Sequence, residues 1–407
     1  MNIYIVNKPQ VNLDYEFVER KGVGHPDTLS DALAETLSAN YSNYTLKRYG
    51  AVLHHNFDKV GLLGGASYVT FGEGHLIKPI RVLINGRAST KFGDEEIPVK
   101  EFLISWSKEF IKSRFPMINP EKDLEFHYNL SNQSSPGKTE EFESTNAPRK
   151  HWFEPRSLND LPELKKLVSN DTSLGVGYAP YTILEQLILK IEGTLNSDEF
   201  KKVNHWIGSD IKIMGFRYRQ QFGITMCIPQ IANYVKSVEA YKANLTKARE
   251  VIYKIAKDLE ISDLELNFNT RDNYKTMELY LTATGSSIES GDEGLVGRGN
   301  RINGVISPTK PMSMEGACGK NPVYHIGKVY YVAANEISKK IYRKYGVSNE
   351  VALVSQSGRD LLDPWAIFIT LPTDFSEVDS VKKLVETEVK SIPEITKLLL
   401  KQEIQLY

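Results

Sequence analysis

Apolar residues recur with a spacing of three or four in three stretches of this chain, and each stretch is followed by a short apolar run. In the first two stretches, the residues that share a helix face are Leu33, Leu37 and Tyr41, and Val329, Ala333, Ile337 and Ile341. Both stretches end in two basic residues followed by Tyr-Gly, at 47–50 and 343–346, which is typical of a helix C-terminus. The runs at 51–54 and 351–355 predict strands after these two helices.

A third stretch repeats the arrangement without the Tyr-Gly ending, with a helix expected at 248–259 and a strand at 264–268. The similarity between the first two stretches is typical of an internally repeated α+β unit. Because helix–turn–strand is a common arrangement, chance similarity is the alternative interpretation.

Further periodic segments predict two more helices and three more strands. The helices are expected at 99–115 and 183–195, and the strands at 124–130, 211–215 and 277–283. Residues 131–162 differ, because they are polar, contain several prolines and show no sustained periodicity. A loop of this length in a compact protein is usually functional or disordered. No linker separates independent domains, so we expect residues 1–407 to form one compact unit.

The composition limits which binding partners and which cellular compartment we expect for this protein. The chain of 407 residues is 41% hydrophobic and 25% charged, with a net charge of −1, which gives no electrostatic reason to expect nucleic acid or an anionic membrane as a partner. Cys227 and Cys318 are too few for a disulfide framework. Residues 1–10 lack the apolar core of a signal peptide, and apolar runs such as 365–371 are too short to span a bilayer. We therefore expect a cytoplasmic protein.

Glycines alternate with charged residues in two segments, 291–301 and 319–322, that have no apolar stripe. Glycine lets backbone N–H groups approach a ligand closely, and arginine and lysine supply the positive charge that a polyphosphate requires. A third glycine loop, at 22–27, adds an imidazole and a carboxylate. Together these segments predict a site for a nucleoside triphosphate and a metal ion. Their spacing matches neither a P-loop nor a Rossmann fingerprint.

The strongest candidate residues also have structural interpretations. Asp27 precedes the first helix, so it could cap the helix N-terminus, and the same position would keep its carboxylate ionised for a cation. His25 could donate a hydrogen bond to a developing anion. Arg298 could bind phosphate, or it could pair on the surface with Asp292 or Glu293.

Other polar residues give weaker signals. His54 and His55 are adjacent, so on a strand they would face opposite sides, which disfavours a shared metal ion and favours structural roles. Asp171 lies among turn-forming residues and could cap a turn. Asp210 and Lys212 have the i,i+2 spacing that is common on solvated strands.

Taken together and in this order, the motifs resemble those of the archaeal-type S-adenosylmethionine synthetases, also called methionine adenosyltransferases. The resemblance runs through residues 19–27, 53–56, 170–180, 196–200, 210–215, 291–308, 312–315, 319–322 and 325–328. Members of this family join ATP and L-methionine. The thioether sulfur attacks C5′ of the ribose and displaces the triphosphate, which is then hydrolysed to pyrophosphate and phosphate.

The resemblance also implies a fold and an assembly. The fold class is α+β, with three similar sheet-and-helix subdomains that are interleaved in sequence and lie around a pseudo-threefold axis. The family places its active sites between two subunits, so at least a homodimer is expected. Within the compact unit, residues 131–162 are expected to form a mobile loop that covers the substrates.

Individual roles follow from the same resemblance. The residues implied in catalysis are His25, Lys212, Arg298 and Lys320. The residues implied in ATP binding are Asp210, Lys212, Arg298, Lys320, Gln133, Ser134 and Ser135. The residues implied in methionine binding are Asp171, Asp292 and Gln133. His25 would hydrogen-bond the departing oxygen, and Asp27 would hold Mg²⁺, with two ions expected per site. The family pattern also allows a potassium ion.

Three positions depart from the bacterial and eukaryotic branch of the family. Thr28 and Gly299 stand where that branch has lysine, and residues 321–328 lack the aspartate that holds its second Mg²⁺. Asp58 and Glu315 are the remaining candidates for the second metal.

Two other functions would use the same motifs. A phosphotransferase would move the γ-phosphate to an acceptor, and a non-catalytic nucleotide sensor would bind ATP without turnover. The presence of His25, Asp27, Lys212 and Arg298 argues against a degenerate sensor.

Overall fold

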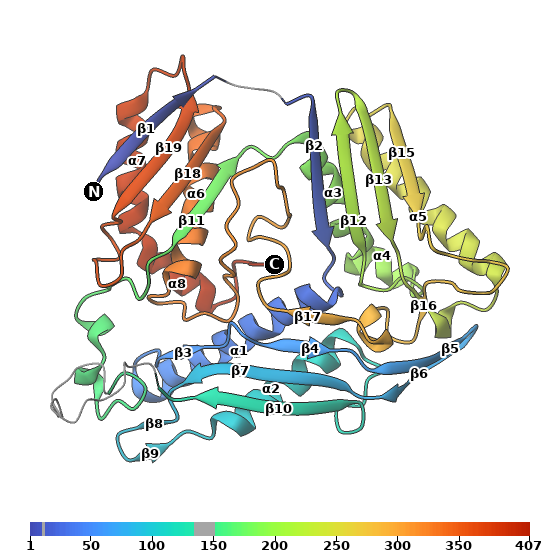
Figure 1. The fold of residues 1–407 in the computed structure, drawn as a ribbon, viewed down its shortest axis with the longest axis horizontal. Coiled ribbons are helices and arrows are strands. Elements are labelled where there is room, and N and C mark those ends of the chain that lie inside the picture. The colour runs from blue at the N-terminus through green and yellow to red at the C-terminus, as the bar shows by residue number, and fades with distance from the viewer. Residues whose placement is uncertain (10–12, 134–150) are drawn as a thin grey trace.

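The computed structural model of this protein describes residues 1–9, 13–133 and 151–407. In this part of the chain, three larger sheets each pack against helices and have their own apolar core. The three units lie at the left, the right and the bottom of Figure 1.

The sheet at the bottom of Figure 1 contains the segment in which the first glycine loop leads into a helix. Its strands, in order, are β10 (Leu124–Ser131), β7 (Ile80–Ala88), β4 (Gly61–Leu63) and β17 (Glu293–Leu295), with β3 (His55–Asn56) also paired to β7. Its helices are α1 (Pro26–Tyr49) and α2 (Val99–Arg114). The face predicted for the first helix, Leu33, Leu37 and Tyr41, is buried in this core.

The sheet at the right consists of β15 (Leu264–Phe268), β13 (Gln221–Cys227), β12 (Lys212–Tyr218) and β2 (Tyr15–Lys21). Its helices are α3 (Ile183–Leu195), α4 (Asp198–Val203) and α5 (Val238–Asp258). Helix α3 begins at a capping box, in which the side chains of Thr182 and Glu185 each accept the backbone N–H of the other residue. Apolar residues of α3, including Leu184, Leu187 and Ile188, fill this core.

The sheet at the left consists of β1 (Ile3–Lys8), β19 (Ala366–Pro372), β18 (Asn349–Val354) and β11 (Leu174–Ala179). Its helices are α6 (Ile326–Tyr345), α7 (Val378–Lys390) and α8 (Ile392–Leu400). The face predicted for the second periodic helix, Val329, Ala333, Ile337 and Ile341, is buried here.

Shorter elements connect these units. The short strands are β5 (Ala66–Thr70), β6 (Glu73–Lys78), β8 (Lys91–Phe92), β9 (Glu95–Glu96), β14 (Gln230–Ile231) and β16 (Leu281–Thr282). The 3₁₀ helices are η3 (Leu158–Asp160), η4 (Pro162–Leu164), η5 (Ala232–Tyr234) and η6 (Ser287–Ser290).

The chain passes repeatedly between the three units. Strands β1 and β2 are neighbours in sequence but belong to the left and right sheets. The segment from α1 to β10 builds the bottom unit, β11 returns to the left sheet, and β17 later re-enters the bottom sheet. Each core therefore contains segments that are far apart in sequence, which explains why no linker is visible.

The ends of the two Tyr-Gly helices are confirmed. Gly50 and Gly346 adopt the left-handed conformation, with φ of 82° and 65°, and their N–H groups bond to Leu46 O and Tyr342 O. Glycine tolerates this conformation without a steric penalty, so it ends a helix readily.

Two predicted strands are wrong. Residues 51–54 are buried but form no strand, because Leu53 N bonds to the side chain of Thr45 at 3.2 Å instead of to a neighbouring strand. Of residues 277–283, only β16 is a strand, since Glu278 bonds back to Asn273 in a tight local turn. The helix predicted at 248–259 is confirmed as α5, but it begins ten residues earlier, at Val238. The remaining predicted helices and strands are confirmed to within a few residues at their ends.

Candidate active site

Helix α1 begins directly in the first glycine loop. Pro26 is its first residue and His25 is its N-cap, whose Nδ1 accepts the backbone N–H of Asp27 at 3.1 Å. The prediction that Asp27 caps the helix is therefore wrong, because proline at the first helical position moves the cap to His25. Asp27 lies in the first turn, where the helix dipole favours a carboxylate.

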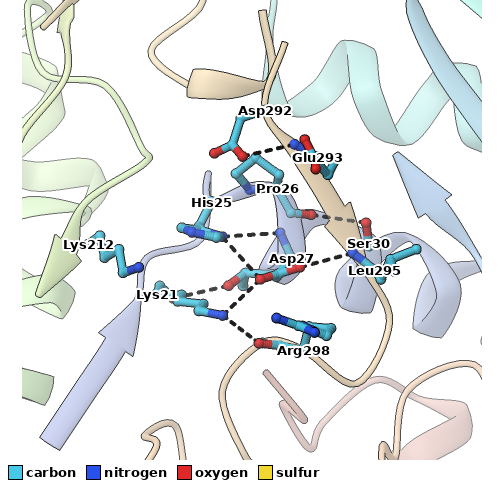
Figure 2. A network of polar contacts seen from close by, with 12 residues as sticks. Lys21, His25, Pro26, Asp27, Ser30, Lys212, Asp292, Glu293, Leu295 and Arg298 are labelled. Atoms are coloured by element: carbon cyan, nitrogen blue, oxygen red, sulfur yellow. Dashed lines mark hydrogen bonds and ion pairs between the residues drawn. The ribbon is translucent and has the colours of Figure 1, made fainter. Parts of the chain in front are cut away.

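Both oxygens of the Asp27 carboxylate have partners (Figure 2). Oδ2 lies 2.8 Å from Lys21 Nζ, and Oδ1 accepts the backbone N–H of Leu295 at 3.0 Å. Lys21 Nζ also donates to the carbonyl oxygen of Arg298 at 2.6 Å. Asp27 and Lys21 thus join the end of β2, the start of α1 and the glycine-rich segment 291–301.

The His25 ring is set up to donate a proton from Nε2. Burial is the largest influence on the ring and lowers its pKa, although the charges of Asp210 and Asp27 act in the opposite direction. A neutral ring whose Nδ1 accepts a hydrogen bond carries its proton on Nε2. No residue in the described ranges bonds to Nε2, so this N–H is available to a ligand.

Asp210 is buried immediately before β12. Its Oδ2 accepts the N–H of Ser287 at 2.9 Å and lies 3.2 Å from the hydroxyl of Tyr280, and burial raises its pKa. Lys212, two residues later, has a half-exposed side chain that lies 3.2 Å from Glu19 Oε1. The two residues therefore do not form a solvated pair on one strand face.

Ser287 joins Asp210 to Asp292. Its hydroxyl oxygen lies 2.7 Å from the Asp210 carboxylate and 2.8 Å from the Asp292 carboxylate. Asp292 is itself exposed, in the segment between η6 and β17. Two of the predicted substrate-binding aspartates thus share one hydroxyl group.

Arg298 presents an exposed guanidinium group beside this cluster. Within residues 1–9, 13–133 and 151–407, no carboxylate pairs with its side chain, so the alternative interpretation, a surface pair with Asp292 or Glu293, is wrong. Figure 2 shows His25, Lys212, Asp292 and Arg298 arranged around Asp27. The guanidinium is free to bind an anion.

Two glycines allow the segment 291–301 to approach α1 closely. A Cβ at Gly294 would collide with the backbone of Pro26, and a Cβ at Gly299 would collide with the carboxylate of Asp31. Any other residue at these positions would push Arg298 away from the start of the helix.

Lys320 belongs to a second cluster, at the N-terminus of α6. Its Nζ pairs with Glu315 and lies 3.7 Å from Asp58 Oδ2. Ser173 Oγ donates to Glu315 at 3.3 Å. Among the described residues no hydrogen bond or ion pair joins Lys320 to the His25 cluster. In the described residues, Lys320 thus has ion-pair partners of its own and shares none of them with Lys212 or Arg298, the other two predicted phosphate-binding residues.

Asp171 lies beside this second cluster. Its carboxylate accepts the N–H of Thr172 at 2.7 Å, as predicted for a residue that caps a turn. Ser355 Oγ bonds to the carbonyl oxygens of Asp171 and Ser173, which places the loop before β11 next to Glu315. The two aspartates predicted to bind methionine, Asp171 and Asp292, thus lie in different clusters.

The predicted covering loop is only partly within the described residues. Gln133 is exposed just after β10, whereas Ser134 and Ser135 lie outside the described ranges. Further along the predicted loop, the Trp152 ring stacks on His54 with centroids 5.5 Å apart. No substrate contact of residues 131–162 can be assigned from these positions, so the covering role stays a prediction.

His54 and His55 have separate structural partners, as predicted. His54 Nδ1 lies 2.6 Å from Tyr324 OH, whereas His55 Nε2 lies 2.8 Å from Ser38 Oγ. Among the described residues, no group of three or more His, Cys, Asp or Glu side chains could hold a metal ion. A metal at this site would therefore need further ligands from elsewhere, such as phosphate oxygens.

Three residues that organise the site gave no separate signal in the sequence. Lys21 lies within the motif at 19–27, and Asp31 and Glu35 lie on α1, where they read as ordinary polar positions of a helix. Only the tertiary contacts of these side chains reveal what they hold.

Comparisons with known proteins show the family to which the chain belongs. The family model for S-adenosylmethionine synthetase matches residues 2–403. The chain is 36% identical to an S-adenosylmethionine synthase from Caldivirga maquilingensis over 97% of this chain and 96% of the relative. It is also 36% identical to an S-adenosylmethionine synthase from Methanocaldococcus jannaschii, over 96% and 95% of the two chains.

The fold is similar to that of a solved structure described as an unusual S-adenosylmethionine synthetase from Campylobacter jejuni. The TM-score is 0.60 over 96% of this chain and 94% of that one, with 15% sequence identity, so this likeness concerns the fold alone. The family model and these relatives, which match nearly the whole chain, define an ATP-binding transferase. The chain belongs to the S-adenosylmethionine synthetase family, in its archaeal type, and is a methionine adenosyltransferase. None of the described helices is both long and apolar enough to cross a membrane.

Proposed function

We propose that the cluster at the start of α1 carries the adenosyl transfer from ATP to the sulfur of L-methionine. The reaction turns a neutral sulfur into a sulfonium ion while a highly charged triphosphate departs. Groups that stabilise the departing charge are therefore the main catalytic requirement. The observation that carries the proposal is the arrangement of His25, Lys212 and Arg298 around Asp27.

His25 is proposed to hydrogen-bond the oxygen that leaves C5′. Its Nδ1 is engaged by the N–H of Asp27, so a neutral ring presents Nε2–H to the ligand. Because the cap fixes the ring orientation, this donor needs little reorganisation when negative charge develops.

Arg298 and Lys212 are proposed to bind the triphosphate. Arg298 has an exposed guanidinium without a carboxylate partner in the described ranges, and a guanidinium can hold two phosphate oxygens at once. Lys212 is half exposed and, among the described residues, pairs only with Glu19. The buried Asp210 and the neighbouring Asp292 are proposed to face the nucleoside and the methionine ammonium, respectively.

Asp27 fits a magnesium ion in chemistry and position. Mg²⁺ prefers oxygen ligands and is commonly held by one or two carboxylates together with the phosphates of the substrate. The Asp27 carboxylate faces the cluster, and Lys21 already supplies a positive charge to its Oδ2. When bound, Mg²⁺ would neutralise charge on the triphosphate. Asp58 and Glu315, the candidates for a second ion, both pair with Lys320.

The same site is proposed to hydrolyse the tripolyphosphate before release. One experiment tests both reactions: ATP and L-methionine are mixed with the protein, and S-adenosylmethionine, pyrophosphate and phosphate are measured by mass spectrometry and ion chromatography. Equal amounts of the three products are expected. Formation of ADP with a phosphorylated acceptor would instead support a phosphotransferase, and binding without turnover would support a sensor.

The active unit is proposed to be at least a homodimer with shared sites. The open face of the right-hand sheet exposes Tyr15, Phe17, Met214, Phe216 and Tyr218. Exposed apolar patches of this kind mark interaction surfaces, and a second copy of the chain is the proposed occupant. We also propose that the dimer brings the Lys320 cluster of one subunit to the His25 cluster of the other. Analytical ultracentrifugation tests the assembly, and a stable monomer would contradict it.

Two further features are proposed from the family. The three sheet-and-helix units are proposed to be related by a pseudo-threefold axis, with residues 1–407 as one interleaved unit. Residues 131–162, including Gln133, Ser134 and Ser135, are proposed to cover bound substrates. Limited proteolysis of this segment with and without ATP and methionine tests the cover, since ligands should slow the cleavage.

A further inference from the structure

Helix α1 carries a stripe of three acidic residues, Asp27, Asp31 and Glu35, at intervals of four. This spacing puts them on one face of the helix. Each accepts a backbone N–H from one of the two glycine-rich segments. The hydrogen bonds run from Leu295 N to Asp27 at 3.0 Å, from Gly297 N to Asp31 at 2.8 Å, and from Gly319 N to Glu35 at 3.0 Å.

Asp31 is part of a set of charged side chains that fixes the backbone around Arg298. While Asp31 holds Gly297 N, the guanidinium of Arg301 donates to Gly297 O at 2.7 Å and to Gly299 O at 2.8 Å. Lys21 holds the carbonyl oxygen of Arg298 itself. The backbone on both sides of Arg298 is therefore anchored, while the Arg298 side chain stays exposed.

Glu35 anchors the turn that precedes Lys320 in a similar way. Its two oxygens accept Nζ of the fully buried Lys328 at 2.8 and 2.7 Å, and one of them also accepts Gly319 N. Gly319 has φ of 78°, a turn conformation that needs such support. Ser38, on the next turn of α1, donates to Lys320 O at 3.0 Å.

Burying a carboxylate costs free energy, so the presence of these groups in the protein interior is better explained by a role other than stability. Burial raises the pKa of Asp31 to about 7, although the N–H of Gly297 and the charge of Arg301 act against this shift. Buried ion pairs contribute little net stability compared with apolar residues of similar size. What these groups do provide is a fixed geometry for two loops that have no regular structure around their key residues.

We propose that Asp31 and Glu35 are positioning residues, which fix Arg298 and Lys320 respectively relative to helix α1. The inference rests on the proposed roles of Arg298 and Lys320 in binding the triphosphate. It predicts that each acidic residue acts through one particular cation. A displacement of a catalytic group by about 1 Å can cost about 10²-fold in rate, so the effects should be large.

Double-mutant cycles test this pairing. Asp31→Leu should lower kcat by about 10- to 100-fold in the wild-type background. In the Arg298→Ala background it should lower kcat by less than about threefold, because the group through which it acts is already gone. The variant Glu35→Leu/Lys328→Met replaces both partners of the buried ion pair by apolar residues. It should also lower kcat by about 10- to 100-fold alone, and by less than about threefold in the Lys320→Ala background. The crossed combinations, Asp31→Leu with Lys320→Ala and Glu35→Leu/Lys328→Met with Arg298→Ala, should give multiplicative losses.

Matched variants separate positioning from folding. Asp31→Asn and Glu35→Gln/Lys328→Met each keep an oxygen that can accept the loop N–H, so both should keep kcat within about fivefold of the wild-type value. They also keep the test valid if the leucine variants fail to fold. Ser30→Ala removes a buried hydroxyl on α1 whose only partner in the described part of the chain is Pro26 O, and it should leave kcat unchanged.

Two outcomes would contradict different parts of the proposal. Multiplicative losses in the matched cycles, or loss of activity in Asp31→Asn with an unchanged melting temperature, would rule out positioning through Arg298 and Lys320. Full activity of Arg298→Ala and Lys320→Ala alone would instead contradict the proposed function on which the inference rests.

Discussion

His25 and His325 occupy the same position on two different helices. Each is the N-cap of its helix, and its Nδ1 accepts the N–H of the residue two positions later, at 3.1 Å for Asp27 and 3.3 Å for Gly327. Both helices also end at a left-handed glycine that follows Tyr. An internal repeat would produce such matching ends of α1 and α6, and it stays a prediction.

His25→Asn should reduce S-adenosylmethionine formation by about 10²- to 10⁴-fold while the protein stays folded. Asparagine is a good N-cap, so the helix start is retained, but the imidazole Nε2–H is lost. His325→Asn is the matched control, since it makes the same change at the equivalent cap of α6. Synthesis at the wild-type rate by purified His25→Asn would contradict the proposed donor role.

Asp27→Asn should raise the Mg²⁺ concentration needed for half-maximal activity by at least about tenfold, because the anionic ligand is lost. The amide oxygen can still accept Leu295 N, but the Lys21 ammonium loses its carboxylate. We therefore expect the free energy of unfolding to fall by about 1–3 kcal/mol. Activity titrations with Mg²⁺ and urea unfolding measure the two effects separately. A less stable variant with an unchanged Mg²⁺ requirement would make Asp27 purely structural.

Arg298→Ala should slow both synthesis and the cleavage of added tripolyphosphate by about 10²- to 10³-fold, as for removal of a charge-stabilising donor. Both reactions are affected because the leaving group of the first is the substrate of the second. Arg298→Lys keeps the charge but cannot form the two-pronged contact, so it should also lose activity. If Arg298→Lys performs both reactions at wild-type rates, the bidentate contact is wrong.

Mixing two inactive variants should restore activity if the site is shared between subunits. We expect His25→Asn and Lys320→Ala to be inactive alone. The two variants are unfolded together in equal amounts and refolded. Half of the resulting dimers then contain one chain of each variant, and each of these dimers has one intact site. The expected activity is therefore about one quarter of the wild-type value. No recovery, with mixed dimers demonstrated by mass spectrometry of tagged chains, would place both residues in a site built by one chain.

The buried His55 should make the protein less stable in mild acid. Burial lowers its pKa from 6.5 to about 3. Above pH 6.5 the ring is neutral in both states, so this contribution to stability is fully present there. As the pH falls from 6.5 toward 3, only the unfolded chain takes up the proton, and stability falls by about 1.4 kcal/mol per pH unit from this group.

Urea unfolding between pH 5 and 7 measures this slope. His55→Gln should reduce the average slope over this range by about 1 kcal/mol per pH unit, whatever its effect on absolute stability. Ser38→Ala is the control, because it removes the hydroxyl that faces His55 Nε2 but keeps the titrating ring. It should lower stability and keep the slope. An unchanged slope in His55→Gln would show that His55 does not control the acid response.

Much of the local structure could be predicted because it depends on neighbouring residues. The apolar spacing of Leu33, Leu37 and Tyr41 places one face of α1 in a core, and Gly50 ends the helix. The prediction for Asp27 failed because the cap depends on which side chain reaches the free N–H groups, and here that is His25. The strand expected at 51–54 failed because Leu53 N found a side-chain partner.

The sequence by itself determined the family, the positions of most helices and the residues with the right chemistry for binding a triphosphate. These features depend on side-chain type and on short-range spacing, which are visible along the chain. Only the tertiary structure decided which of the candidates meet. It joined His25, Asp27, Asp210, Lys212, Asp292 and Arg298, and it placed Lys320 and Asp171 in a second cluster. It also showed that Asp31 and Glu35 hold the two glycine-rich loops. The contacts of Asp31 and Glu35 with these loops join residues more than 200 positions apart. No local pattern encodes them, because they form only when three interleaved cores pack together.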